Sequence, residues 1–130
     1  MRHISFNPRF VNTAGNDLIP GKIHTIRHNY DWWKQWEGKE VALFTWEGKP
    51  YQKGSKQKVF CVKRIVSVQK IYLMADDCFK WFGFQETPLS IINKELARND
   101  GFVSERDFGE WFADYKPGRM AILHFTDYRY

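Results

Sequence analysis

The sequence predicts a single α+β domain in which a small mixed β-barrel has about three helices packed around it. The chain has 130 residues, and one core commonly serves a chain of roughly 100–200 residues. Val- and Ile-rich segments are interspersed with capped helical segments, without the regular alternation that a parallel sheet requires. At this length a fold hides about two thirds of the surface of the unfolded chain, so the core needs no disulfide.

The predicted strands are rich in β-branched and aromatic residues and are bounded by turn residues. The first follows the turn pair Pro20-Gly21 and reads KIHTIRH. The four strands are predicted at 22–28, 41–46, 59–74 and 120–128.

The segment 47–58, EGKPYQKGSKQK, is predicted to be a solvated hairpin loop because it is rich in Gly, Pro and Lys. The strand that follows, 59–74, is long for a single strand. Lys63 and Arg64 fall on its opposite faces. We therefore expect a bend or bulge near them, as in strands that curl into barrels.

Helices are predicted where a capping residue precedes an apolar pattern of helical period. At 104–118, Ser104 is the predicted cap and Pro117 ends the helix. A second helix is predicted at 87–101, with Thr87 as cap, Pro88 at the first helical position and Asn99 to Gly101 at the end. A short third helix is predicted at 31–38, between Asp31 and Gly38.

Composition favours a cytoplasmic protein with a polyanionic partner. The N-terminal MRHISFNPRF has no apolar segment of the kind found in signal peptides, and no stretch has the ~18 apolar residues of a membrane span. Cys61 and Cys78 are predicted to be buried thiols in a reducing compartment. The net charge is +5 and the aromatic fraction 18%, and aromatic rings beside basic side chains are what base stacking requires. A monomer is the simplest expectation, although nothing in the sequence sets the oligomeric state.

The strand at 22–28 has the pattern of a functional site because neither of its faces is purely apolar. Thr25 and Arg27 share one face, and Lys22, which leaves a turn, can fold its long side chain back towards Thr25. Thr25 would be a nucleophile if a base or cation activated it, and Arg27 would depress the pKa of a nearby Lys22. The same two cations would equally bind a phosphate. They would also suit an ordinary solvated sheet edge.

Metal binding is not expected, and neither is a cofactor. His24 and His28 are four residues apart, which brings two side chains together on a helix but not on a strand. The tryptophans at 31–36 are chiefly packing residues of the predicted helix. One of them cannot share their common face, and we take Trp33 as the ring that lines a cleft.

Three segments resemble the ASCH domain, a branch of the PUA-like superfamily. The motif G-K-x-x-T-x-R is met by Gly21, Lys22, Thr25 and Arg27. The segment 97–112, ARNDGFVSERDFGEWF, resembles that family's acidic residue, Gly and aromatic followed by a capped helix. MAILHFTDY at 120–128 sits where the family's last barrel strand would be.

This resemblance implies a PUA-like β-barrel with a cleft between barrel and helices, and an association with RNA or modified nucleosides. In one bacterial subgroup, which hydrolyses the acetyl amide of acetylcytidine, the catalytic set is a Lys, a Thr and a Glu. By the motif match these fall on Lys22, Thr25 and Asp100. Asp100 is one methylene shorter than the Glu of the hydrolases, and a displacement of about 1 Å can cost about 100-fold in rate.

We therefore expect an RNA- or nucleotide-binding domain that uses Lys22, Thr25, Arg27 and Trp33 as ligand contacts. The alternative is an amidohydrolase with Lys22, Thr25 and Asp100 as catalytic residues. A third reading is an accessory protein whose basic face contacts another protein. The segment 74–86 matches no part of the family pattern; it is predicted to add a hairpin strand whose Lys80, Trp81 and Phe82 extend a binding surface or close the core.

Overall fold

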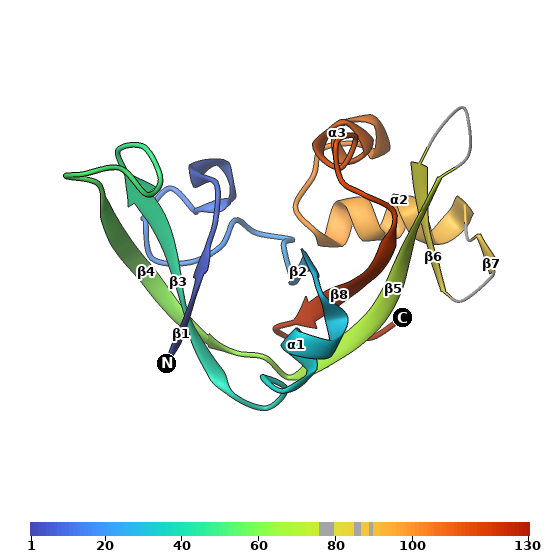
Figure 1. The fold of residues 1–130 in the computed structure, drawn as a ribbon, viewed down its shortest axis with the longest axis horizontal. Coiled ribbons are helices and arrows are strands. Elements are labelled where there is room, and N and C mark those ends of the chain that lie inside the picture. The colour runs from blue at the N-terminus through green and yellow to red at the C-terminus, as the bar shows by residue number, and fades with distance from the viewer. Residues whose placement is uncertain (76–79, 85–86, 89) are drawn as a thin grey trace.

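The computed structural model describes residues 1–75, 80–84, 87–88 and 90–130. These residues form a three-stranded sheet, a five-stranded sheet and three α-helices, which confirms the predicted α+β class. In Figure 1 the two sheets diverge like the arms of a V, with α2 and α3 beside the five-stranded arm. The described strands do not pair into one closed barrel.

The three-stranded sheet contains the predicted hairpin. β3 (Glu40–Glu47) pairs with β4 (Lys56–Arg64) in antiparallel fashion, with a register irregularity between Leu43 and Phe44. On the other side of β3 lies β1 (Arg2–Ser5), a parallel strand absent from the prediction. A short 3-10 helix, η1 (Pro8–Phe10), follows β1.

The five-stranded sheet has the order β2, β8, β5, β6, β7. Its centre is the antiparallel pair of β5 and β8, and β2 lies on the outer side of β8. The strands span His24–His28 (β2), Ser67–Ala75 (β5), Lys80–Phe84 (β6), Thr87–Pro88 (β7) and Gly118–His124 (β8).

The long predicted strand at 59–74 is broken where a bend was expected. Ile65, fully buried, donates its backbone N–H to the carbonyl of Lys39, whereas Val66 donates to the carbonyl of His124. The chain therefore changes hydrogen-bond partners, from the first sheet to the second, within one residue. In Figure 1 the ribbon turns at the base of the V at this point.

Two of the three predicted helix starts are wrong. α3 (Glu105–Trp111) has Ser104 as its N-cap, as predicted, and the side chain of Ser104 accepts from the N–H of Asp107 at 3.1 Å. α1 (Tyr30–Lys34) is capped by Asn29 instead of Asp31. Asn29 has φ 69°, a left-handed conformation that Asn tolerates better than most residues.

α2 (Ser90–Asn99) starts later than predicted because Thr87 and Pro88 belong to β7, which pairs with β6. α3 ends at Trp111 rather than running to residue 118, because Phe112 leaves the helical conformation. At the start of α2 the strand pairing of β7 outweighs the local helical pattern. At the end of α3 the turn after Trp111 does so.

The segment 74–86 does contribute a hairpin strand, β6, which pairs with β5. Of the three side chains named in the prediction, Phe82 belongs to the core. Phe82 is buried against Phe108 and Phe112, and Lys80 donates to the backbone carbonyls of Ala113 and Tyr115. Residues 76–79, and with them the predicted thiol of Cys78, lie outside the described residues.

Candidate ligand-binding pocket

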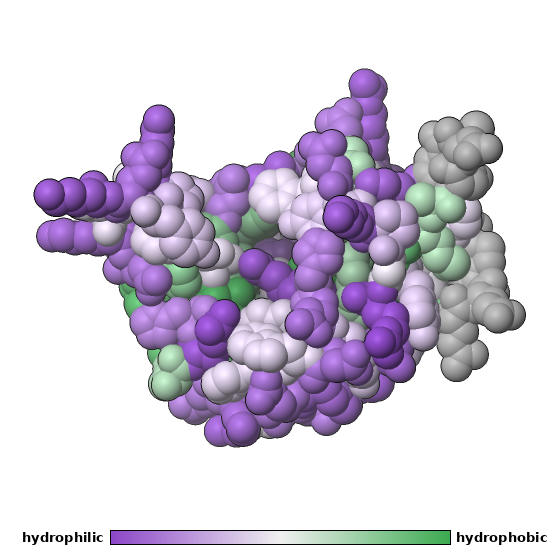
Figure 2. Space-filling model, in the orientation of Figure 1, coloured by the Kyte–Doolittle hydropathy of each residue, from purple (hydrophilic) through white to green (hydrophobic). Residues whose placement is uncertain are grey.

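A pocket of about 490 Å³ opens between the two sheets and is lined by residues from both. Figure 2 shows this face of the molecule hollowed near its centre, with hydrophilic side chains projecting from the hairpin side. The volume falls within the range of pockets that enclose a small ligand. Its floor is formed by the four residues that the sequence indicated: Lys22, Thr25, Arg27 and Asp100.

Lys22 reaches the floor of the pocket because it precedes β2, so its side-chain direction is not fixed by the alternation of side chains along that strand. Gly21 has φ 91°, a conformation favoured by glycine, and the N–H of Lys22 donates to the carbonyl of Ile19 in this turn. The next residue, Ile23, donates its N–H to the carbonyl of Asn99, the last residue of α2. The turn thus places Lys22 against the C-terminus of α2.

Lys22 and Asp100 form a buried ion pair. The Lys22 ammonium donates to the Asp100 carboxylate at 2.9 Å and to the Asp100 backbone carbonyl at 2.6 Å. Both residues are almost inaccessible to solvent. The carbonyl is one of those that a helix leaves unpaired at its C-terminus, where a cation is favoured.

Burial is the main reason that the pKa of Lys22 is lowered, and the Asp100 carboxylate opposes this effect only in part. Arg27 and Arg9 add smaller repulsive contributions in the same direction. The ammonium also lies 4.4 Å from the centre of the Phe10 ring. Lys22 therefore loses its proton more readily than a lysine at the surface.

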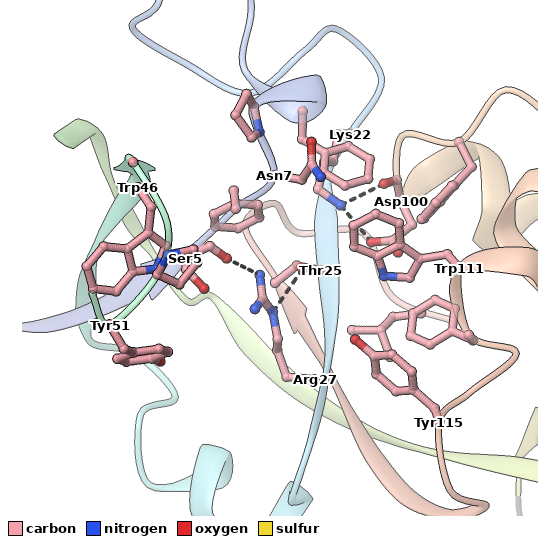
Figure 3. Close-up of a pocket in the computed structure, with 18 residues that line it drawn as sticks. Ser5, Asn7, Lys22, Thr25, Arg27, Trp46, Tyr51, Asp100, Trp111 and Tyr115 are labelled. Atoms are coloured by element: carbon pink, nitrogen blue, oxygen red, sulfur yellow. Dashed lines mark hydrogen bonds and ion pairs between the residues drawn. The ribbon is translucent and has the colours of Figure 1, made fainter. Parts of the chain in front are cut away.

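Thr25 and Arg27 lie on the same face of β2, as the alternation predicts, and both line the pocket. Arg27 donates from Nε to the Thr25 hydroxyl at 3.4 Å and from a terminal nitrogen to the backbone carbonyl of Ser5 at 2.7 Å. Figure 3 shows the guanidinium between Thr25 and Ser5, which belong to different sheets. Its remaining N–H groups are free to face a ligand.

Aromatic rings form two opposite walls above this floor. In Figure 3, Trp46 and Tyr51 lie on one side and Trp111 and Tyr115 on the other. The rings on the first side and beneath it come from the residue after β1, from η1 and from the β3–β4 hairpin: Phe6, Phe10, Trp46 and Tyr51. Those on the second side come from the α2–α3 turn, from α3 and from the segment that follows α3: Phe102, Trp111, Phe112 and Tyr115.

Trp33 does not line this pocket, contrary to the prediction. It is buried in the core from α1, and its ring meets that of Trp32 edge-on at 4.7 Å. Nor does α1 form a wall of the pocket, because it packs against β5 and β8. The sequence did hold a signal for the actual rings: Trp46 and Tyr51 lie in or beside a Lys-rich hairpin, where aromatic residues have no core to fill.

A buried hydrogen-bond network supports the floor from behind. Asp100 accepts from His24 Nδ1 at 3.2 Å as well as from Lys22. With Nδ1 donating, His24 Nε2 is left to accept from the Tyr130 hydroxyl at 2.6 Å, and that hydroxyl accepts from Asn99 at 3.0 Å. Two independent partners therefore hold the Asp100 carboxylate in place. Sequence reasoning assigned no role to His24 beyond rejecting it as a metal ligand.

His124 lies beside this network and is held neutral. Its Nε2 donates to Gln69 at 3.0 Å, while its Nδ1 has no partner among the described residues. Burial, and secondarily the nearby His24, lower the pKa of His124 to about 4. Protonation would place a charge on an imidazole that has no acceptor for a second proton.

Comparisons with known protein families, with curated proteins and with solved structures found no match for this chain. Among the described residues, no group of His, Cys, Asp and Glu is arranged to hold a metal ion. The helices in that part of the chain are too short or too polar to span a membrane. The case for a function therefore rests on the pocket.

Proposed function

We propose that the pocket binds one nucleotide of a single-stranded RNA, with the base between the aromatic walls and polar groups meeting it at the floor. The observation that carries this proposal is the combination of facing aromatic rings with buried hydrogen-bonding groups in one pocket. Single-stranded RNA is recognised by stacking of unpaired bases on aromatic side chains and by hydrogen bonds to their edges.

The charges of the floor suit a ligand that carries negative charge or carbonyl oxygens. Asp100 neutralises Lys22, whereas no acidic side chain pairs with Arg27 in the described residues. Arg27 therefore remains the cation available to a phosphate or a base carbonyl. The net charge of +5 favours the same class of partner.

We also propose that the chain is a divergent ASCH domain, with its two sheets corresponding to an opened PUA-like barrel. In support, the G-K-x-x-T-x-R motif and the Asp100-Gly101-Phe102 element, distant in sequence, meet at this pocket. We propose a cytoplasmic location, where Cys61, a half-buried free thiol, would stay reduced.

The binding proposal is tested by titrating the protein with the four ribonucleoside monophosphates and following tryptophan fluorescence. Trp46 and Trp111 line the pocket, so we expect at least one nucleotide to quench the emission. Trp111→Phe should remove part of this quenching, whereas Trp33→Phe, which alters a ring outside the pocket, should not. Failure of all four nucleotides to bind would contradict the proposal.

A second candidate function, amide hydrolysis, is favoured by the contact between Lys22 and Asp100 beside the Thr25 hydroxyl. In this reaction the Thr25 oxygen would attack an acyl carbon while Lys22, in its neutral form, accepts the hydroxyl proton. The amine would leave with the proton that Lys22 took up, and water would then hydrolyse the acyl-threonine ester, which releases the carboxylic acid and regenerates Thr25. Arg27 would stabilise negative charge on the threonine oxygen.

Acetate release from acetylcytidine tests the second candidate. A Thr25→Val variant should lose turnover by orders of magnitude, whereas Thr25→Ser should keep part of it. If native protein and Thr25→Val release acetate equally, Thr25 is not the nucleophile. If the protein binds acetylcytidine but releases no acetate, only the first candidate function, nucleotide binding, remains.

A further inference from the structure

The hairpin that joins β3 to β4 is the most basic feature at the mouth of the pocket. Residues 46–58, here named the hairpin arm, contain a single acidic residue, Glu47. In the described part of the chain, no acidic partner neutralises its lysines. All four are exposed to solvent: Lys49, Lys53, Lys56 and Lys58.

The hairpin arm also presents an exposed aromatic ring. Tyr51 is 91% exposed, and its ring centre lies 5.1 Å from that of Trp46. Its φ of 60° is unfavourable for a residue other than Gly or Asn. A large ring in a strained, exposed position beside a pocket fits a binding role better than a packing role.

The opposite rim of the pocket has no such surplus of positive charge. Four acidic residues, Glu105, Asp107, Glu110 and Asp114, lie on or just after α3. The basic residues at this rim are Arg106, Lys116 and Arg9. Arg106 pairs with Glu110 at 3.3 Å, and Arg9 pairs with Asp107. A polyanion that crosses the pocket would therefore be attracted to the hairpin arm and not to α3.

We propose that the hairpin arm binds the phosphate backbone of the RNA whose base enters the pocket. This inference rests on the proposed function and names a second binding surface for it. The lysines contact phosphates on one side of the bound nucleotide, and Tyr51 stacks on the neighbouring base. The RNA strand thus leaves the pocket on the side of the hairpin arm and not on the side of α3.

The test compares two variants with the same net charge. In the first, the four lysines of the hairpin arm are changed to Gln. In the second, four exposed cations outside the arm are changed instead: Lys39, Lys94, Arg98 and Arg129. Thermal melting of both variants checks that they remain folded. The probes are a fluorescein-labelled single-stranded RNA decamer of mixed sequence, the matching DNA decamer, and the free ribonucleoside monophosphates.

The hairpin variant should bind the RNA decamer about tenfold to a hundredfold more weakly near 0.1 M salt, and its salt dependence should be shallower by about 2–3 in log–log slope. The control variant should keep most of the native affinity and slope. Binding of free nucleotides should be unchanged in both. Tighter binding of the RNA decamer than of the DNA decamer supports RNA as the ligand of the hairpin arm. Equal affinity for the two decamers means that the arm binds single strands of either kind, and it overturns the choice of RNA.

Tyr51→Asn tests the stacking part separately, because Asn tolerates the left-handed conformation. We expect this variant to fold normally and to bind the decamer about fivefold to a hundredfold more weakly. If the two charge variants weaken RNA binding equally, the inference is wrong while the proposed function stands. If native protein binds nucleotides but no decamer, the inference is wrong and the proposed function is reduced to binding of free nucleotides. If no nucleotide binds, the proposed function itself fails.

Discussion

Lys22 is placed by one turn and held by two bonds to a single residue. Gly21 allows the turn, and Asp100 offers both its carboxylate and its backbone carbonyl to the ammonium. Because both side chains are buried, neither charge can be compensated by water if its partner is removed. The same pair therefore serves the pocket and the stability of the fold.

Lys22→Met should destabilise the protein by about 3–5 kcal/mol, because it leaves the Asp100 carboxylate buried without a cation. The double variant Lys22→Met, Asp100→Asn should recover most of this loss, since it removes both charges. Urea unfolding of both variants measures the difference, with Lys94→Met as a control at an exposed position. A loss below about 1 kcal/mol in the single variant would contradict the stabilising role given to this buried pair.

His124 should make the protein less stable in mild acid. Its folded pKa of about 4 lies below the ordinary value of 6.5, so the unfolded chain takes up a proton first as the pH falls. The stabilisation from the neutral imidazole is complete above about pH 6.5 and is lost progressively towards pH 4, by about 3 kcal/mol in total.

The measurement is the free energy of unfolding at several values between about pH 7.5 and pH 4.5, for the native chain and for His124→Gln. The Gln variant can still donate to Gln69 but does not titrate in this range. Its pH dependence should be shallower than that of the native chain. If the free energy of unfolding depends on pH in the same way in the two proteins, His124 is not the cause of the loss of stability in acid.

At the scale of elements, the turn from α2 to α3 does two things at once. The N–H of Gly101 donates to the carbonyl of Arg98, and that of Phe102 donates to the carbonyl of Ala97. This pattern of bonds ends a helix at a glycine. It also places Asp100 on the pocket floor and Phe102 in its wall. The Asn-Asp-Gly sequence is thus both a helix stop and part of the candidate site.

Gly101→Ala should cost about 2–4 kcal/mol, because Gly101 has φ 87° and an added Cβ would lie 3.0 Å from the Cβ of Lys22. It should also weaken nucleotide binding by displacing Lys22. Gly109→Ala is the matched control: this glycine lies within α3 with open space around it, so the change should stabilise the helix by about 0.5–1 kcal/mol. Thermal melting compares the two, and similar effects would contradict this account.

At the scale of the whole molecule, the pocket exists because two sheets diverge from the junction at Ile65. Arg27 in β2 donates to the carbonyl of Ser5 in β1, and its guanidinium lies 4.9 Å from the centre of the Phe6 ring. This side chain therefore links the two arms of the V at the floor of the pocket.

Arg27→Met should destabilise the fold by about 1.5–3 kcal/mol, the usual contribution of a hydrogen bond from a charged donor. It should also abolish or greatly weaken nucleotide binding. Arg119→Met removes an exposed pair with Asp31 and should cost less than about 1 kcal/mol. Denaturant unfolding and nucleotide titration of both variants make the comparison. Unchanged binding in Arg27→Met would contradict the role given to this residue.

The patterns of β2, β3 and β8, the hairpin, the break after Arg64 and the Ser104 cap were predictable because each is signalled by neighbours in sequence, whereas β1 was missed. The same holds for the shared face of Thr25 and Arg27, which follows from strand alternation. The starts of α1 and α2 were missed, because Asn29 adopts a left-handed conformation and Thr87 pairs with nearby Phe84 in β6 instead of capping a helix. Trp33 was misplaced because its exposure depends on how α1 packs against β5 and β8.

The sequence by itself determined which chemical groups the candidate site holds: its motif supplies Lys22, Thr25 and Arg27, and the Asn-Asp-Gly turn supplies Asp100. Only the tertiary structure decided that Lys22 pairs with Asp100, and which aromatic rings face them. A local pattern sets the direction of a side chain relative to its own strand or helix. The partners of that side chain are 78 residues away for Lys22, and they depend on how the two sheets and α3 pack.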